Sequence, residues 1–77
     1  MDMRLPLLAA GMEFGTVVRW LKREGEPVVA GEPVVEVEAE KANHELEAPA
    51  SGTLAEIVAV DGDEIAVGAL LAVIEPA

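Results

Sequence analysis

The chain has no cysteine, no tyrosine, one serine and one histidine among its 77 residues. Without cysteine there is no disulfide framework and no thiol chemistry supplied by the protein itself, which suits a reducing compartment. Side chains that serve as nucleophiles or general bases are therefore scarce. We expect a domain that is not itself an enzyme.

Basic residues are also few, with 5 Lys and Arg against 15 Asp and Glu and a net charge of −10. This balance argues against nucleic acid, since phosphate contacts need clustered cations, and against an anionic membrane surface. The longest apolar runs, near residues 5–12 and 67–74, are too short to span a bilayer. We expect a cytoplasmic protein, or one of the mitochondrial matrix in a eukaryote. The acidity either favours partners with basic patches or keeps a small domain soluble.

An internal repeat divides the chain into two halves. A shift of 37 residues places residues 15–38 on residues 52–75 with five identities. The identities in the first half are Gly15, Thr16, Gly25, Gly31 and Glu38. Glycines that recur in register mark turns where the backbone takes a positive φ. The two halves should therefore share one fold.

Each half predicts short strands separated by turns, because it is rich in valine, poor in aromatics and interrupted by glycine and proline. The expected strands are residues 15–23, 28–29 and 34–38 in the first half and 53–60, 65–67 and 70–75 in the second, preceded by extended segments at 3–8 and 43–47. Two β half-units around one core predict an all-β domain over residues 1–77. Its architecture should be a flattened barrel or sandwich with approximate two-fold symmetry.

The repeat also predicts where Lys41 lies. The 37-residue shift places Lys41 on position 4, near the N-terminus, and places the residues just before it on the C-terminal residues 75–77. The two termini should therefore lie together at one end of the domain, with Lys41 at the opposite end.

Three other candidates for chemistry are weak. Ser51 is followed by glycine in a turn and has no evident base. His44 is a lone histidine without metal-ligand spacing, so we interpret it as a surface strand residue that at most helps a partner recognise the nearby turn. Residues 61–64 lack the ligand spacing of an EF-hand calcium loop. We predict no catalytic residue and no metal site.

Lys41 differs from these candidates because it is the only basic residue after Arg23. It sits in Ala39-Glu40-Lys41-Ala42, between two alternating segments, which predicts the tip of a hairpin. The small alanines leave its amine approachable. We predict that this amine is a covalent attachment point.

With these residues in place, the sequence resembles the lipoyl branch of the lipoyl/biotinyl attachment family over essentially its whole length. The similar stretches are residues 12–21, 24–28, 31–38 and 45–52. At the centre, Glu40-Lys41-Ala42 resembles the family's acidic-Lys-Ala modification motif. The resemblance implies a flattened β-barrel of two four-stranded antiparallel sheets. It also implies lipoate bound to Lys41 through an amide, with Glu40 and Ala42 recognised by the modifying ligase.

Domains of this kind belong to acyltransferase (E2) components of 2-oxo acid or acetoin dehydrogenase complexes. The resemblance therefore implies a swinging arm that serves the E1, E2 and E3 active sites in turn. The implied partners are a lipoate ligase or lipoyl transferase, the E1 component, the E2 core and the flavin-containing E3. The domain itself is expected to be a monomer, and the cofactor supplies the chemistry.

Alternatives remain open. A biotinyl carrier of a carboxylase usually has methionines beside its lysine, where this chain has Glu40 and Ala42. The glycine-cleavage H-protein shares the carrier principle but is longer, and an unmodified adaptor could keep the same fold. Two departures from the lipoyl pattern stand out. Glu40 replaces the aspartate of many members, and the loop 8–11, which lies near the modified turn in the family and bears on partner choice, is unusually plain.

Overall fold

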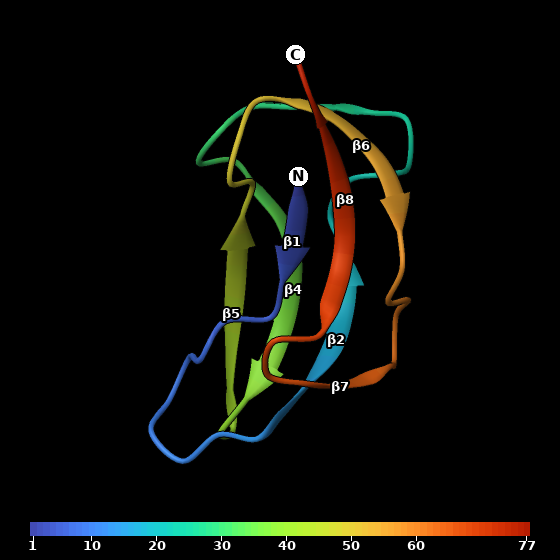
Figure 1. Ribbon diagram of the computed structural model, residues 1–77. Helices are drawn as coiled ribbons and strands as arrows, with labels where there is room; N and C mark the ends of the chain where they lie inside the picture. Colours follow the sequence, from blue (N-terminus) through green and yellow to red (C-terminus); the bar gives the residue numbers. More distant parts are fainter.

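The computed structural model describes residues 1–77 as eight strands without a helix. The strands are β1 (Asp2–Arg4), β2 (Phe14–Trp20), β3 (Pro27–Val28), β4 (Pro33–Ala39), β5 (Ala42–Glu47), β6 (Gly52–Ile57), β7 (Glu64–Ala66) and β8 (Leu70–Pro76). They form two four-stranded antiparallel sheets, ordered β1-β8-β6-β3 and β5-β4-β2-β7 (Figure 1). The molecule measures 35 × 20 × 17 Å. The predicted flattened all-β architecture is confirmed. The structure contains no helix that could span a membrane.

The core between the sheets consists of 16 buried hydrophobic residues, mostly valine, leucine and alanine. The alternation along β4 sends Val35 and Val37 inward, where both are fully buried, and Glu36 and Glu38 outward. Burial of one such aliphatic side chain contributes about 1.5–3 kcal/mol. Since no polar side chain is buried, the polar groups are left to shape turns and surface.

The repeat appears in the structure as two matched glycine turns, each hydrogen-bonded to the opposite half of the chain. Gly25 and Gly62 have φ values of 89° and 90°. The Gly25 amide donates to the Leu54 carbonyl at 2.7 Å, and the Gly62 amide donates to the Val17 carbonyl at 2.7 Å. Leu54 is the repeat mate of Val17, so each half closes the turn of the other. This confirms the predicted two-fold relation.

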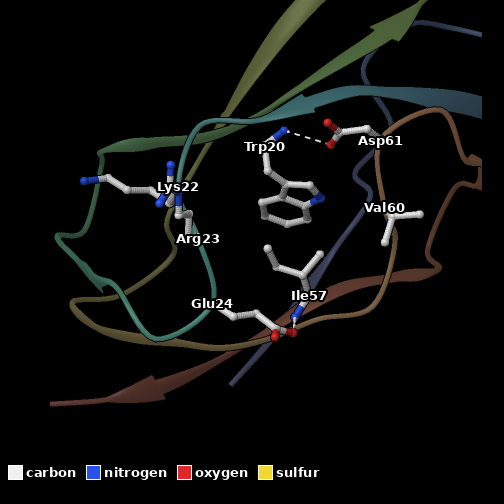
Figure 2. A pocket seen from close by; sticks show the side chains of 7 residues that line it. All are labelled: Trp20, Lys22, Arg23, Glu24, Ile57, Val60 and Asp61. Atoms are coloured by element: carbon white, nitrogen blue, oxygen red, sulfur yellow. Dashed lines mark hydrogen bonds between the residues drawn. The ribbon is translucent and has the colours of Figure 1, made fainter.

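Two carboxylates repeat the pattern at the ends of two strands. The Ile57 amide donates to the Glu24 carboxylate at 2.7 Å, and the Trp20 amide donates to the Asp61 carboxylate at 3.2 Å (Figure 2). β2 ends at Trp20 and β6 at Ile57, three residues before the predicted ends at Arg23 and Val60. The next amides still donate to the neighbouring strands, Leu21 to the Val34 carbonyl at 2.8 Å and Val58 to the Leu71 carbonyl at 2.9 Å.

The edge strands correct the predicted mate of Lys41. Arg4 pairs with Leu70 and Glu47 pairs with Pro33. Because Leu70 is the repeat mate of Pro33, Arg4 corresponds to Glu47, and its predicted equivalence to Lys41 is wrong. The uniform shift fails here because the connection between β1 and β2 is longer than its counterpart between β5 and β6.

That connection also ends β1 early. The predicted extended segment 3–8 is a strand only as far as Arg4. Leu5 still bonds to Ala69 and Gly68, and the next residue, Pro6, has no amide to donate. From Arg4 to Gly15 the chain is six residues longer than from Glu47 to Gly52. The connection therefore extends as a loop toward the end of the molecule that holds the β4–β5 turn (Figure 1). It is the largest departure from the two-fold relation.

The predicted placement of the termini is confirmed. The Met1 amine donates to the Ile74 carbonyl at 2.7 Å, and the Ile74 amide donates to the Met1 carbonyl at 2.8 Å. In Figure 1 both ends of the chain lie toward the top, while the turn between β4 and β5 lies at the bottom. Lys41 is thus held at the end of the long axis opposite the C-terminus.

Candidate functional site: the Glu40-Lys41 turn

The turn between β4 and β5 consists of two residues in an unusual backbone conformation. Ala39 pairs with Ala42, so Glu40 and Lys41 alone make the connection. Their φ values are 52° and 64°, as in the type I′ turn that matches the twist of a hairpin. Such turns favour Asn-Gly, because a left-handed conformation costs an ordinary residue about 1–2 kcal/mol. The site therefore stores backbone strain.

The strands below the turn hold this strain in place. β4 is a central strand, paired with β5 on one side and β2 on the other. At the base of the turn Ala39 is 3% exposed and belongs to the core. A strained conformation persists where its surroundings over-determine it. The turn is consequently a fixed platform for the Lys41 side chain.

The Lys41 amine is free of partners. Glu40, Lys41 and Ala42 are all exposed, and no hydrogen bond or ion pair engages Lys41. Three of the other four cations are paired: Arg4 with Asp2 at 3.1 Å, Arg19 with Glu36 at 3.3 Å and Lys22 with Glu32 at 3.2 Å. An external enzyme can therefore reach the Lys41 amine without displacing any group of the domain.

The surroundings of the turn are acidic. On the outer face of β4 and β5, Glu36 lies opposite Glu45, and Glu38 lies opposite Asn43. His44 lies on the edge strand β5 opposite the fully buried Val37 and is half-buried, so it is a strand residue that remains partly exposed. Its role in recognition stays a prediction.

The remaining sequence candidates serve the fold, as predicted. The Ser51 hydroxyl oxygen accepts a hydrogen bond from the Ala30 amide at 2.9 Å. Within the segment considered as a calcium loop, the Asp63 carboxylate accepts from the Val60 amide at 3.0 Å, and Asp61 accepts from the Trp20 amide. These oxygens shape turns.

The larger of two surface hollows lies where the two halves meet, and sequence analysis did not single it out. It measures about 640 Å³ and is lined by Trp20, Lys22, Arg23, Glu24, Ile57, Val60 and Asp61 (Figure 2). Its signal in the sequence was the repeat itself, which matches Trp20 with Ile57 and Glu24 with Asp61. The Trp20 indole N–H donates to the Ala59 carbonyl at 2.6 Å, and both carboxylates are engaged by backbone amides. Both carboxylates of the hollow thus hold backbone amides, and Lys41 lies in neither hollow.

An exposed lysine without an ion-pair partner, on a two-residue turn outside both hollows, suits a carrier domain, which presents a covalently bound group to other proteins. The chain matches, over residues 1–74, the family model Biotin_lipoyl, described as "Biotin-requiring enzyme". It belongs to this biotin/lipoyl attachment family.

Relatives lie on the lipoyl side of the family. The chain is 40% identical over 74 residues to the dihydrolipoyllysine-residue succinyltransferase component of the 2-oxoglutarate dehydrogenase complex of Bartonella vinsonii, covering 96% of this chain and 18% of that protein. It is 36% identical to the lipoyl domain of the 2-oxoglutarate dehydrogenase complex from Azotobacter vinelandii, with a TM-score of 0.81, 100% of this chain covered and 99% of the other. The resemblance to lipoyl domains, which are carriers without catalytic activity of their own, is confirmed.

A third comparison shows that backbone shape does not separate the two branches of the family. A single-chain, multi-domain long-chain acyl-CoA carboxylase superimposes with a TM-score of 0.85 at 28% identity, covering all of this chain and 7% of the carboxylase. The nature of the carried group must therefore be argued from the residues around Lys41. The chain spans less than a fifth of the acyltransferase component from Bartonella.

Proposed function

We propose that Lys41 carries lipoate through an amide bond. In this proposal the domain displays the lipoyl group as a mobile arm for an acyltransferase component of a 2-oxo acid dehydrogenase complex. The observation that carries the proposal is the Glu40-Lys41 turn, whose lysine is exposed, unpaired and fixed at the end of the molecule. The similarity to lipoyl domains of such complexes supports it.

The residues of the turn fit this modification. An amide forms when the neutral Lys41 amine attacks the carbonyl of an activated lipoyl carboxyl group, which expels the activating group as the nitrogen loses a proton. The amine must therefore be accessible and free of an ion pair, as it is here. Glu40 and Ala42 flank the amine and would be read by the ligase as parts of a rigid shape. Methionine at these two positions would favour biotin. When bound, the dithiolane supplies the acyl and electron transfer that this chain's side chains lack.

The placement of the termini suits a tethered carrier. A linker joined to either terminus would leave the Lys41 end pointing outward (Figure 1). Tethering raises the effective concentration of the arm at each active site within reach. The proposed partners are a lipoate ligase or lipoyl transferase, the E1 decarboxylase, the E2 core and the flavin-containing E3. We propose that the domain works as a monomer, in the cytoplasm or the mitochondrial matrix.

Intact-mass measurement after co-expression with lipoate ligase and biotin ligase tests the proposal. We expect a lipoyl increment that disappears in Lys41→Arg and persists in the matched control Lys22→Arg. A biotin increment would assign the domain to the biotinyl branch, which the carboxylase likeness keeps as the second candidate. No increment of either kind would assign it to unmodified adaptors.

A further inference from the structure

An apolar stripe runs along the outer face of β2. Phe14 is 54% exposed and Val18 is 39% exposed, with the half-buried Thr16 between them. Alternate residues of a strand share a face, and the intervening Gly15 and Val17 are buried. Phe14 and Thr16, together with the exposed Val18 at the β-bulge between Val17 and Arg19, form one surface track, called here the β2 stripe.

The β2 stripe begins beside the Lys41 turn. Thr16 pairs with Glu38 on β4, the pair of that ladder nearest the turn, and the same register continued by two residues would place Phe14 near Glu40. Neighbouring strands lie about 4.8 Å apart with a rise of about 3.3 Å per residue, which puts Phe14 within about 10 Å of the Lys41 backbone. In Figure 1 the start of β2 and the β4–β5 turn lie at the same lower end of the molecule.

Carboxylates border this track. Thr16 lies between Glu38 on β4 and Glu64 on β7, while Phe14 lies beside the exposed Ala66 on β7. These glutamates would repel a free fatty acid, whose carboxylate is negative. An acyl chain bound as an amide carries no charge, so the track favours an uncharged chain that arrives already attached.

We propose that the β2 stripe is the resting place of the lipoyl chain carried by Lys41, an inference that rests on the function proposed above. From the Lys41 backbone the arm consists of four methylenes, the amide, four more methylenes and the dithiolane ring. Since Phe14 lies within about 10 Å of the Lys41 backbone, an arm of this length brings its dithiolane ring to the Phe14 end of the stripe. Sulfur next to an aromatic ring is also a favourable contact.

Resting on the stripe removes part of the apolar arm from water without locking it. A partner active site that binds the dithiolane more tightly shifts the arm away from the stripe. The stripe would therefore shelter the reactive end of the arm between visits to its partners.

Nuclear magnetic resonance of the intact domain, with lipoylation first confirmed by mass, tests this placement. We expect nuclear Overhauser contacts between the Phe14 ring protons and the lipoyl methylenes. We also expect lipoylation to shift the resonances of Phe14 and Thr16. Phe14→Ser should abolish the contacts. Val29→Ser is the matched control, because Val29 is 62% exposed and follows β3. β3 pairs with the start of β6, which in turn pairs with the C-terminal end of β8, away from the Lys41 turn.

Reduction of the dithiolane by dithiothreitol gives a second measurement. If the arm rests on the stripe about two-thirds of the time and reacts only when released, Phe14→Ser should speed reduction about threefold, with no change in Val29→Ser.

A lipoylated domain with neither contacts nor a changed rate would overturn the resting place and leave the proposed function intact. If Phe14→Ser slowed only acylation by the E1 component, the stripe would be a partner contact and the proposal wrong. Absence of the mass increment would instead overturn the proposed function.

Discussion

The two halves of the molecule share the hydrogen bonds that shape their turns and differ in the features near Lys41. Gly25 and Gly62 occupy the same backbone conformation, and each is held by the opposite half. The six extra residues between β1 and β2 and the Glu40-Lys41 turn have no counterpart. The features that the two halves share are thus those that the fold requires. The features found in one half only lie near Lys41, where the proposed carrier function needs them.

The largest expected effect is a difference in stability between alanine substitutions at Gly15 and at its repeat mate Gly52. A Cβ at Gly52 would lie 2.1 Å from the Glu75 carbonyl oxygen, a backbone atom that cannot move aside. At Gly15 the nearest atom is Val37 Cγ1 at 3.1 Å, on a side chain that can adjust. We expect Gly52→Ala to destabilise the domain by more than about 4 kcal/mol and Gly15→Ala by about 1–3 kcal/mol.

Urea unfolding of both variants measures this difference. Equal losses in the two variants would mean that the two halves tolerate a side chain equally at this position. The close approach of Gly52 to β8 would then have no special weight.

The next effect concerns the strained turn. Replacing Glu40-Lys41 with Asn-Gly supplies the residues that a type I′ turn favours and should stabilise the domain by about 1–2 kcal/mol. It should also abolish lipoylation, because the amine is gone. Thermal unfolding together with intact mass would check both results. Lys41→Arg, which loses the attachment but keeps a left-handed non-glycine residue, is the control and should leave stability unchanged.

A smaller effect should be nearly equal in the two halves. Glu24→Ala removes the acceptor of the Ile57 amide, and Asp61→Ala removes the acceptor of the Trp20 amide. Each loss should cost about 0.5–1.5 kcal/mol, with Glu24→Ala the larger because its bond is shorter. Denaturant midpoints of the two variants would test this. If only one of the two variants lost stability, Glu24 and Asp61 would not play equivalent roles in the two halves.

The smallest effect belongs to an ion pair found in one half only. The side-chain hydrogen bond from Lys22 and the bond from the Val29 amide lower the pKa of the Glu32 carboxyl group. The repeat mates of Lys22 and Glu32 are alanines, Ala59 and Ala69. A lowered pKa in the folded state stabilises the domain above the pKa of the unfolded chain, and this contribution is lost as pH falls through the folded value.

Lys22→Met should therefore raise the pKa of Glu32 toward its usual value, as followed by the chemical shift of its carboxyl carbon. In Glu32→Gln, the part of the stability that is lost as pH falls through the pKa of Glu32 should be missing from the pH profile. An unchanged pKa in Lys22→Met would assign the shift to the Val29 amide.

Much of the fold could be predicted from sequence because glycines and alternating valines report local geometry. The match of Gly25 with Gly62 and the alternation of Val35 with Glu36 were enough to place turns and central strands. The edge strands escaped because their register depends on the length of a loop, which a uniform shift cannot detect. Only the three-dimensional structure, in which Arg4 pairs with Leu70, shows the true register of the edge strand.

The site was predictable in its identity but less so in its conformation. The lone cation between two strands identified Lys41, and small flanking residues indicated a hairpin tip. The positive φ of both Glu40 and Lys41 carried no sequence signal, because neither residue is glycine or asparagine. Tertiary pairing of β4 on both sides imposes it.

The exchange of turn contacts between halves has a consequence for how such a chain assembles. Gly25 is closed by a carbonyl of the second half and Gly62 by a carbonyl of the first. A polypeptide containing one half alone would leave its own turn open and its apolar face bare. It could complete itself only by pairing with a second copy, in the manner of a domain-swapped dimer. The single chain is in this sense a dimer whose two subunits are joined, and the joint between them is the turn that bears Lys41.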